Sequence, residues 1–149
     1  MRRCFIRNMA RRRDPRCSAP DTCRTRVTEY QISMNPKPCF IFGVFPFEGR
    51  GLDTPVTLGA KATYTVPADK RAQFIYFRAG NSLDELVYIL LQRDGKPMRY
   101  FPVGAKSCLH VSLAVVEDIF PESKLEAWCA GPKGSAGSIV LDIGLVELD

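Results

Sequence analysis

From residue 39 onward, the chain is a series of short apolar runs separated by Gly, Pro, Asn and Asp. The runs are rich in Val, Ile, Phe, Tyr and Thr, which suit the pleated, half-buried surface of a β-sheet. Eight runs have this pattern: residues 39–45, 57–66, 73–78, 85–93, 98–103, 107–113, 124–129 and 138–148. They recur about every ten residues, a spacing typical of sandwiches and barrels. The sequence therefore predicts an all-β fold, a single antiparallel β-sandwich of about eight strands.

One turn between these runs is identified by its residue types. Asp94 and Gly95 separate two apolar runs, and an Asp-Gly pair supplies the two positive φ angles of a type I′ hairpin turn. Pro97 begins the next run and has no N–H group to donate to a neighbouring strand. We therefore expect a hairpin at this point, with its second strand either at the edge of a sheet or beginning at a position that donates no hydrogen bond.

Alternation along the last run predicts which side faces the core. Residues 139, 141, 143 and 145 are Ile, Leu, Ile and Leu, whereas the positions between them include Asp142 and Gly144. Because successive side chains of a strand point to opposite faces, the first set should be buried. The same reasoning places Cys108 and His110 on the outer face of the run 107–113.

Two stretches also have a helical interpretation. Residues 83–91 contain Asp84 and Glu85, which suit a first helical turn, but the run is short and the Asp-Gly turn follows, so a strand is preferred. Residues 115–122 are predicted to form a helical turn that Pro121 ends.

Residues 1–33 differ from the rest of the chain in charge and composition. They contain nine Arg and three acidic residues, a net charge of +6, whereas residues 34–149 carry −1. Their apolar residues are sparse and aperiodic, so we expect a disordered basic leader before one β-sandwich domain, residues 34–149. Three interpretations of the leader remain: an upstream extension with translation starting at Met34, an organelle transit peptide, and an arm that binds nucleic acid or an anionic membrane.

Localisation is predicted from segments that the sequence lacks. The arginines are not followed by the apolar stretch of a secretory signal, and no run approaches the ~18 apolar residues that span a bilayer. The cysteines outside the leader, Cys39, Cys108 and Cys129, are odd in number and form no CxxC motif, unlike a secreted disulfide framework. We therefore expect free thiols and a cytoplasmic protein.

Cys108 and His110 are the candidate metal ligands. They lie two residues apart on one strand face, a chelating spacing, with Cys39 and Cys129 as further candidates. Structural zinc sites usually have paired spacings such as CxxC, however. Cys108 and His110 are also the candidates for a catalytic nucleophile and its base. Side chains two residues apart on a strand are about 7 Å apart, whereas a catalytic thiol–imidazole pair needs a hydrogen bond of about 3 Å. We therefore expect no catalytic residues in this chain.

Residues 45–51 form the first candidate binding surface, with Phe47, Glu48 and Arg50 as its side chains. Aromatic and guanidinium groups are common in binding surfaces, and the glycines here permit close approach of another chain. The alternative is that Phe45 and Phe47 close one end of the sandwich while Glu48 and Arg50 stay solvated.

A second candidate surface is basic. Arg78, Arg93, Arg99 and Lys106 lie in or beside adjacent candidate strands, with tyrosines nearby, and Asn81 lies in the turn after Arg78. Basic residues between aromatic rings are typical of surfaces that bind anions or single-stranded nucleic acid. The −1 charge of residues 34–149 argues against a strong phosphate-binding field, so nucleic acid is a disfavoured partner.

Four segments resemble a family of small bacterial proteins associated with the label molybdopterin oxidoreductase. They are residues 64–71 (YTVPADKR), 75–82 (IYFRAGNS), 93–99 (RDGKPMR) and 101–106 (FPVGAK), and the similarity covers residues 39–148. The resemblance implies redox chemistry with a molybdenum cofactor and carries over no catalytic residue. A sandwich of this size could not enclose a pterin dinucleotide alone, and it has no cluster-type cysteine spacing. The resemblance therefore indicates an accessory or partner domain rather than the enzyme itself.

These features favour a non-catalytic β-sandwich that binds a protein partner or a small ligand and holds no cofactor. A redox protein or subunit related to molybdopterin oxidoreductases is the first alternative. An anion or nucleic-acid binder is the second.

Overall fold

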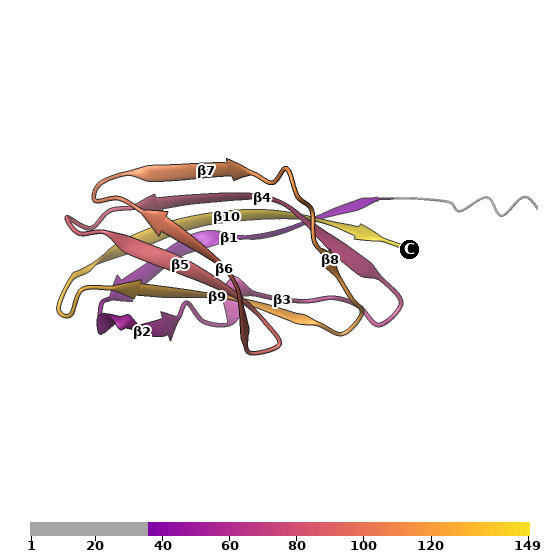
Figure 1. Cartoon of the computed structure of the whole chain (residues 1–149), viewed down its shortest axis with the longest axis horizontal. Helices are drawn as coiled ribbons and strands as arrows, with labels where there is room; N and C mark the ends of the chain where they lie inside the picture. The colour runs from indigo at the N-terminus through magenta and orange to yellow at the C-terminus, as the bar shows by residue number, and fades with distance from the viewer. Residues whose placement is uncertain (1–35) are drawn as a thin grey trace, which may run out of the picture. The chain divides into compact units, whose positions relative to one another are not determined.

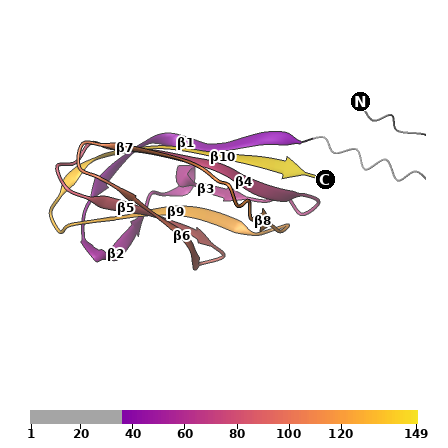
Figure 2. The same cartoon turned by 45° about the horizontal axis from the view of Figure 1, so that its top comes forward.

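The computed structural model describes residues 36–149, so the predictions on the leader concern residues outside the described part. Residues 36–149 form an antiparallel β-sandwich of two five-stranded sheets, which confirms the predicted fold class. Figures 1 and 2 show the sheets as two layers. Within this range no helix is long and apolar enough to cross a membrane.

The first sheet, sheet A, brings the beginning and the end of the described chain together. Its strands, in spatial order, are β1 (Lys37–Glu48), β10 (Ala136–Leu148), β4 (Arg71–Asn81) and β7 (Cys108–Ser112), and β8 (Asp118–Ile119) also pairs with β4. β1 and β10 pair without a register shift, from Lys37 opposite Glu147 to Glu48 opposite Ala136. Both figures show β1 (indigo) running along β10 (yellow). β1 is therefore an edge strand of sheet A.

The second sheet, sheet B, consists of shorter strands. In spatial order they are β2 (Gly51–Thr57), β9 (Lys124–Gly131), β5 (Val87–Arg93) and β6 (Lys96–Val103), and β3 (Thr63–Thr65) also pairs with β9. The β5–β6 turn has φ angles of 52° at Asp94 and 73° at Gly95, which confirms the predicted hairpin. β6, which contains Pro97, lies at the sheet edge as expected.

The core lies between the sheets and combines aromatic and aliphatic side chains. Phe77 of β4 stacks on Phe101 of β6, with ring centroids 3.9 Å apart and planes 8° apart, and Phe74 meets Phe101 edge-on. The alternation predicted for β10 is confirmed, because the side chains at 139, 141, 143 and 145 are all buried. These contacts join the two sheets into one hydrophobic cluster.

Two sequence-based element boundaries are corrected by the structure. The run predicted at 57–66 is divided, because a short 3₁₀ turn, Ala60–Ala62, separates β2 from β3. The helical turn predicted for 115–122 is wrong, since Asp118 and Ile119 form strand β8 beside β4. Ile119 is fully buried there, so tertiary packing overrides the local helical preference. The strand preferred over a helix for residues 83–91 is confirmed from Val87 onward.

Candidate functional site

The first candidate surface is not an exposed aromatic loop. Residues up to Glu48 belong to β1, and the rings of Phe45 and Phe47 are buried in the core, with Phe47 only 5% exposed. Phe47 therefore cannot present its ring to a ligand, and the alternative interpretation, that these rings close the sandwich, holds. Glu48 and Arg50 remain exposed beside it.

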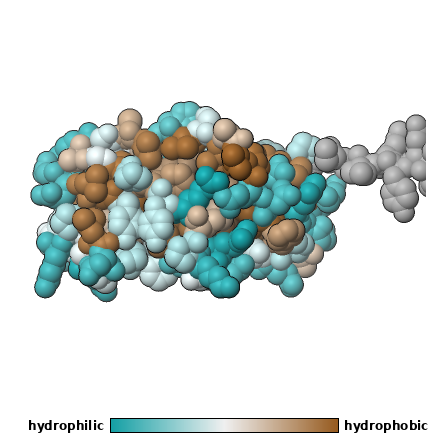
Figure 3. Space-filling view, viewed as in Figure 1, coloured by the Kyte–Doolittle hydropathy of each residue, from teal (hydrophilic) through white to brown (hydrophobic). Residues whose placement is uncertain are grey.

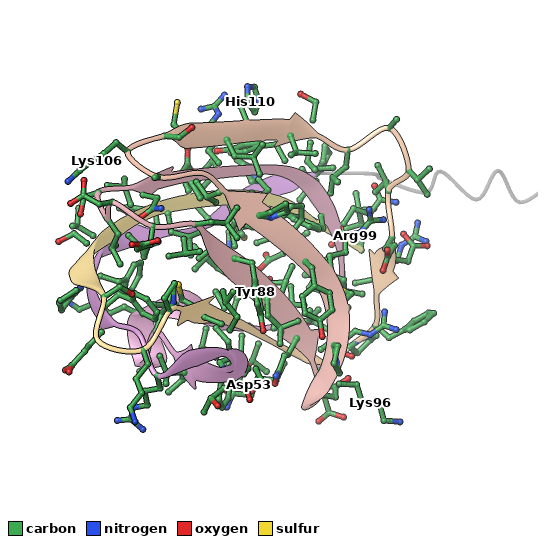
Figure 4. The ribbon with its side chains drawn as sticks, turned by 60° about the vertical axis from the view of Figure 1, so that its left-hand side comes forward. Asp53, Tyr88, Lys96, Arg99, Lys106 and His110 are labelled. Atoms are coloured by element: carbon green, nitrogen blue, oxygen red, sulfur yellow. The ribbon has the colours of Figure 1, made fainter. Side chains whose placement is uncertain are left out.

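The basic candidates do not form one surface. Arg78 lies on β4 of sheet A, whereas Arg99 lies on β6 of sheet B, so the expectation that they lie near each other is wrong. Figure 4 shows Arg99 and Lys106 on opposite sides of the view. This separation argues against a continuous anion-binding stripe.

Three of the four basic candidates, Arg78, Arg99 and Lys106, also have a carboxylate partner. Arg99 donates two hydrogen bonds to Glu117, at 2.6 and 3.0 Å. Arg78 forms an ion pair with Asp142 at 3.4 Å, and Lys106 forms one with Asp84 at 3.4 Å. Their charges are therefore largely compensated within the domain.

Asn81 is the last residue of β4 rather than part of a turn, because the strand continues past Arg78, and its position there is structural. It is 4% exposed, and its side-chain nitrogen donates to the carbonyls of Glu85, at 2.8 Å, and Gly104, at 2.9 Å. Its side-chain oxygen accepts the Leu83 N–H at 2.9 Å. Asn81 therefore joins the β4–β5 connection to the end of β6 rather than facing a ligand.

Cys108 and His110 are exposed on the outer face of β7, as predicted (Figure 4 labels His110). His110 lies opposite Arg78 in the β4–β7 ladder, which places a guanidinium beside the candidate ligands. Among residues 36–149, no three His, Cys, Asp or Glu side chains are grouped closely enough to hold a metal ion. The metal prediction therefore gains no third ligand in the described range.

The other two thiols face the interior. Cys129 of β9 is fully buried, and burial raises its pKa to about 12. Burial and the neighbouring Glu147 carboxylate raise the pKa of Cys39 above its ordinary value. A reactive cysteine needs a lowered pKa, so neither position suits a nucleophile.

The structure reveals a surface that the sequence did not indicate. Phe40, Phe42 and Val44 of β1 and Val140 of β10 lie on the outer side of sheet A, and are 52%, 68%, 65% and 50% exposed, respectively. We call these four side chains the sheet A apolar face. They surround a shallow groove of about 550 Å³, which Tyr76 and Asp142 also line. Figure 3 shows one side of the molecule, on which brown hydrophobic patches are interrupted by teal hydrophilic side chains.

The side of this groove toward β4 is polar. The Tyr76 hydroxyl donates to Asp142 at 3.0 Å, and the Arg78 guanidinium lies 4.6 Å from the centre of the Tyr76 ring. Burial, followed by the Asp142 carboxylate, raises the pKa of Tyr76. A Cβ at Gly144 would overlap the Tyr76 ring, so the ring can lie flat on β10 only because residue 144 is Gly. The groove therefore has an apolar side along β1 and a fixed polar side toward β4.

A separate polar cluster closes the end of sheet A near β3. The Tyr64 hydroxyl donates to Glu147 at 2.6 Å, and Lys37 lies 3.4 Å from the same carboxylate. The Tyr64 hydrogen bond is the main cause that lowers the pKa of the buried Glu147 below its ordinary value. All of its members are partnered, which indicates a structural role.

Comparisons with known proteins give no family. No family model matches the chain, and no curated protein matches it. Among solved structures, it is similar to infectious bursal virus-derived T=1 particles, with a TM-score of 0.44 and 13% identity over 93% of this chain and 35% of that chain. It is also similar to the infectious bursal disease virus VP2 subviral particle, with a TM-score of 0.44 and 12% identity over 76% of this chain and 33% of that chain. The chain spans about a third of these structures, and the likeness assigns it no family or function.

Proposed function

We propose that this chain is a non-catalytic interaction domain that binds a protein partner through the sheet A apolar face. The observation that carries the proposal is the gathering of three large apolar side chains of β1 and one of β10 around a single groove. Exposed apolar side chains are ordinary when scattered, but a contiguous group with a polar rim is typical of interaction sites.

The groove favours a partner that inserts an apolar or aromatic side chain. Such a side chain would cover the apolar walls of the groove, and each apolar side chain that becomes fully buried contributes about 1.5–3 kcal/mol to the free energy of binding. The Tyr76–Asp142–Arg78 group would lie at the rim of this contact and supply polar specificity.

Non-catalytic binding is also consistent with the positions of the chemically reactive groups. The chain has one His, and its strand neighbours are Cys108 and, across the ladder, Arg78. The thiols of Cys39 and Cys129 have pKa values above the ordinary value of cysteine, whereas a nucleophilic thiol needs a lowered pKa. Three of the four cations considered for nucleic-acid binding, Arg78, Arg99 and Lys106, are paired with carboxylates.

The test compares two double variants of the full chain that remove the same side chains from different places. V44S/V140S changes the apolar face, and V115S/V116S changes two exposed valines outside it, in the connection before β8. Proteins captured from an extract of the source organism are quantified with each bait. We expect V44S/V140S to weaken capture of a specific partner about tenfold or more, while the control retains it.

Two results make this comparison decisive. The melting temperatures of the two double variants should match that of the unmodified chain, because all four valines are exposed. Equal capture of every protein by V44S/V140S and the unmodified chain would contradict the proposed function.

A further inference from the structure

The backbone groups of β1 that face the open edge of sheet A can be assigned residue by residue. Ser138, opposite Pro46, uses both of its backbone groups on the β4 side: its C=O accepts from Ser82 N–H at 3.1 Å, and its N–H donates to the Ser82 hydroxyl at 2.7 Å. Pro46 and Ser138 therefore exchange no bond. Because the β1–β10 register is unbroken, the backbone groups of Phe40, Phe42 and Val44 also face away from β10.

These three residues form a short window of free hydrogen-bonding groups. Within the described chain no strand pairs with this side of β1. The next outward-facing positions on either side are Pro38 and Pro46, which have a C=O but no N–H. The two prolines lie at equal distances from Phe42, four residues before it and four after it.

This symmetry makes the edge complementary to itself. In an antiparallel pair centred on Phe42, Phe40 of one copy lies opposite Val44 of the other, and Phe42 lies opposite Phe42. Every free N–H in the window then meets a C=O, and Pro38 lies opposite Pro46, where neither residue has a donor to leave unpaired. Moving the centre by one residue places a proline opposite Phe40 or Val44 and removes a bond from the ladder.

Side-chain chemistry favours the same arrangement. The window presents the exposed Phe40, Phe42 and Val44 on one face, so pairing two copies continues the apolar outer side of sheet A across the contact. The two Phe42 rings would also meet at the centre, where aromatic cross-strand pairs are stabilising.

We propose that β1 pairs with β1 of a second copy of this chain across a two-fold axis at Phe42, joining the two A sheets into one continuous sheet. The contact is isologous, so it closes as a dimer instead of growing into a fibre. This inference goes beyond the proposed function, because it uses the backbone edge of β1 rather than the groove on its face.

The experiment uses the full chain under reducing conditions and measures its sedimentation over protein concentrations of about 1–200 µM. V44P removes one edge N–H from each copy, at a position equivalent to the two prolines already present. V140S, the matched control, trims the apolar face without touching the edge. We expect the unmodified chain and V140S to form a reversible dimer, and V44P to raise its dissociation constant about tenfold or more.

Amide hydrogen exchange shows which backbone N–H groups of β1 are hydrogen-bonded in the dimer. The amides of Phe40, Phe42 and Val44 should exchange slowly in concentrated protein and fast after dilution, whereas those of Ile41 and Phe45, which pair with β10, should stay slow throughout. Three results would overturn the inference: a monomer at every concentration, a V44P dimer as tight as that of the unmodified chain, or edge amides protected independently of concentration. The last result would assign the edge to another segment of the same chain.

The outcomes also separate the two proposals. If the unmodified chain is monomeric at every concentration and V44S/V140S loses partner capture, the dimer inference is wrong and the proposed function stands. If the unmodified chain dimerises and V44S/V140S captures its partners as well as the unmodified chain does, the proposed function is wrong and the dimer stands.

Discussion

Single polar side chains hold the ends of this sandwich together. Asn81 bonds three backbone groups from two connections, and Glu147 accepts from Tyr64 while lying next to Lys37. Both side chains are buried, so the loss of one of their bonds leaves an unpaired polar group in the interior.

Asn81→Ala tests this at the β4–β5 connection. We expect a loss of about 2 kcal/mol in the free energy of unfolding, because the carbonyl of Gly104 and the N–H of Leu83 lose their partner. Urea denaturation measures it. Glu85→Ala is the control, since Glu85 contributes its backbone and not its side chain to the network, and its effect should stay below about 0.5 kcal/mol.

Tyr64→Phe tests the ionisation of Glu147. The hydrogen bond from Tyr64 lowers the pKa of this carboxyl below its ordinary value of 4.5, so the stabilisation is present above pH 4.5 and is lost as the pH falls through the lowered pKa. We expect Tyr64→Phe to cost about 1 kcal/mol at pH 7 and progressively less in acid.

Denaturation from pH 7 to pH 2 gives the comparison for Tyr64→Phe. Tyr88→Phe is its control, because the Tyr88 hydroxyl donates to the carbonyl of Leu52, which does not titrate. Its cost should not change with acid pH. A cost of Tyr64→Phe that is equally constant would show that Glu147 does not mediate the effect.

At the scale of strands, the sequence predicted elements well where one face is polar and the other apolar. In β10, Asp142 and Gly144 mark the outer face, and the opposite face is buried as predicted. In β1 both faces are apolar, so alternation could not show that Phe40, Phe42 and Val44 are exposed while Ile41 and Phe45 are in the core. This ambiguity concealed the candidate binding surface.

Gly95→Ala tests the hairpin that the Asp-Gly pair predicted. A Cβ at Gly95 meets no neighbouring atom, so the substitution adds backbone strain alone, at the observed φ of 73°. We expect a loss of roughly 1–2 kcal/mol in the free energy of unfolding. Lys96→Ala, the next position along, should have a much smaller effect, and equal effects of the two variants would show that φ is not the cause.

At the scale of the whole molecule, the sequence could not predict which strands become neighbours. Arg78 and Arg99 lie about 20 residues apart in the chain, and strand order alone separates them into two sheets. A binding surface that spans several strands depends on this topology, and local patterns do not encode it. The outer side of sheet A, built from β1 and β10, is an example of such a surface.

Deletion of residues 1–33 tests the independence of the domain. Most of the buried apolar residues of the described chain already form one cluster, from Ile41 to Leu145, so we expect the melting temperature to change by no more than a few degrees. Thermal unfolding followed by circular dichroism measures it. A much larger fall would show that these residues contribute to the packing.

The pairing of β1 with β10 has a consequence for biosynthesis. β10 is translated after every other described strand, yet it lies between β1 and β4, so β1 has no strand partner among the described residues, and β4 lacks one of its partners, until β10 has left the ribosome. Sheet B needs only residues up to Gly131 and can form earlier. During translation, the apolar inner side of β1 therefore stays without its β10 neighbour until the last described strand has been made, and unpaired apolar strands of this kind are the surfaces through which incomplete chains aggregate.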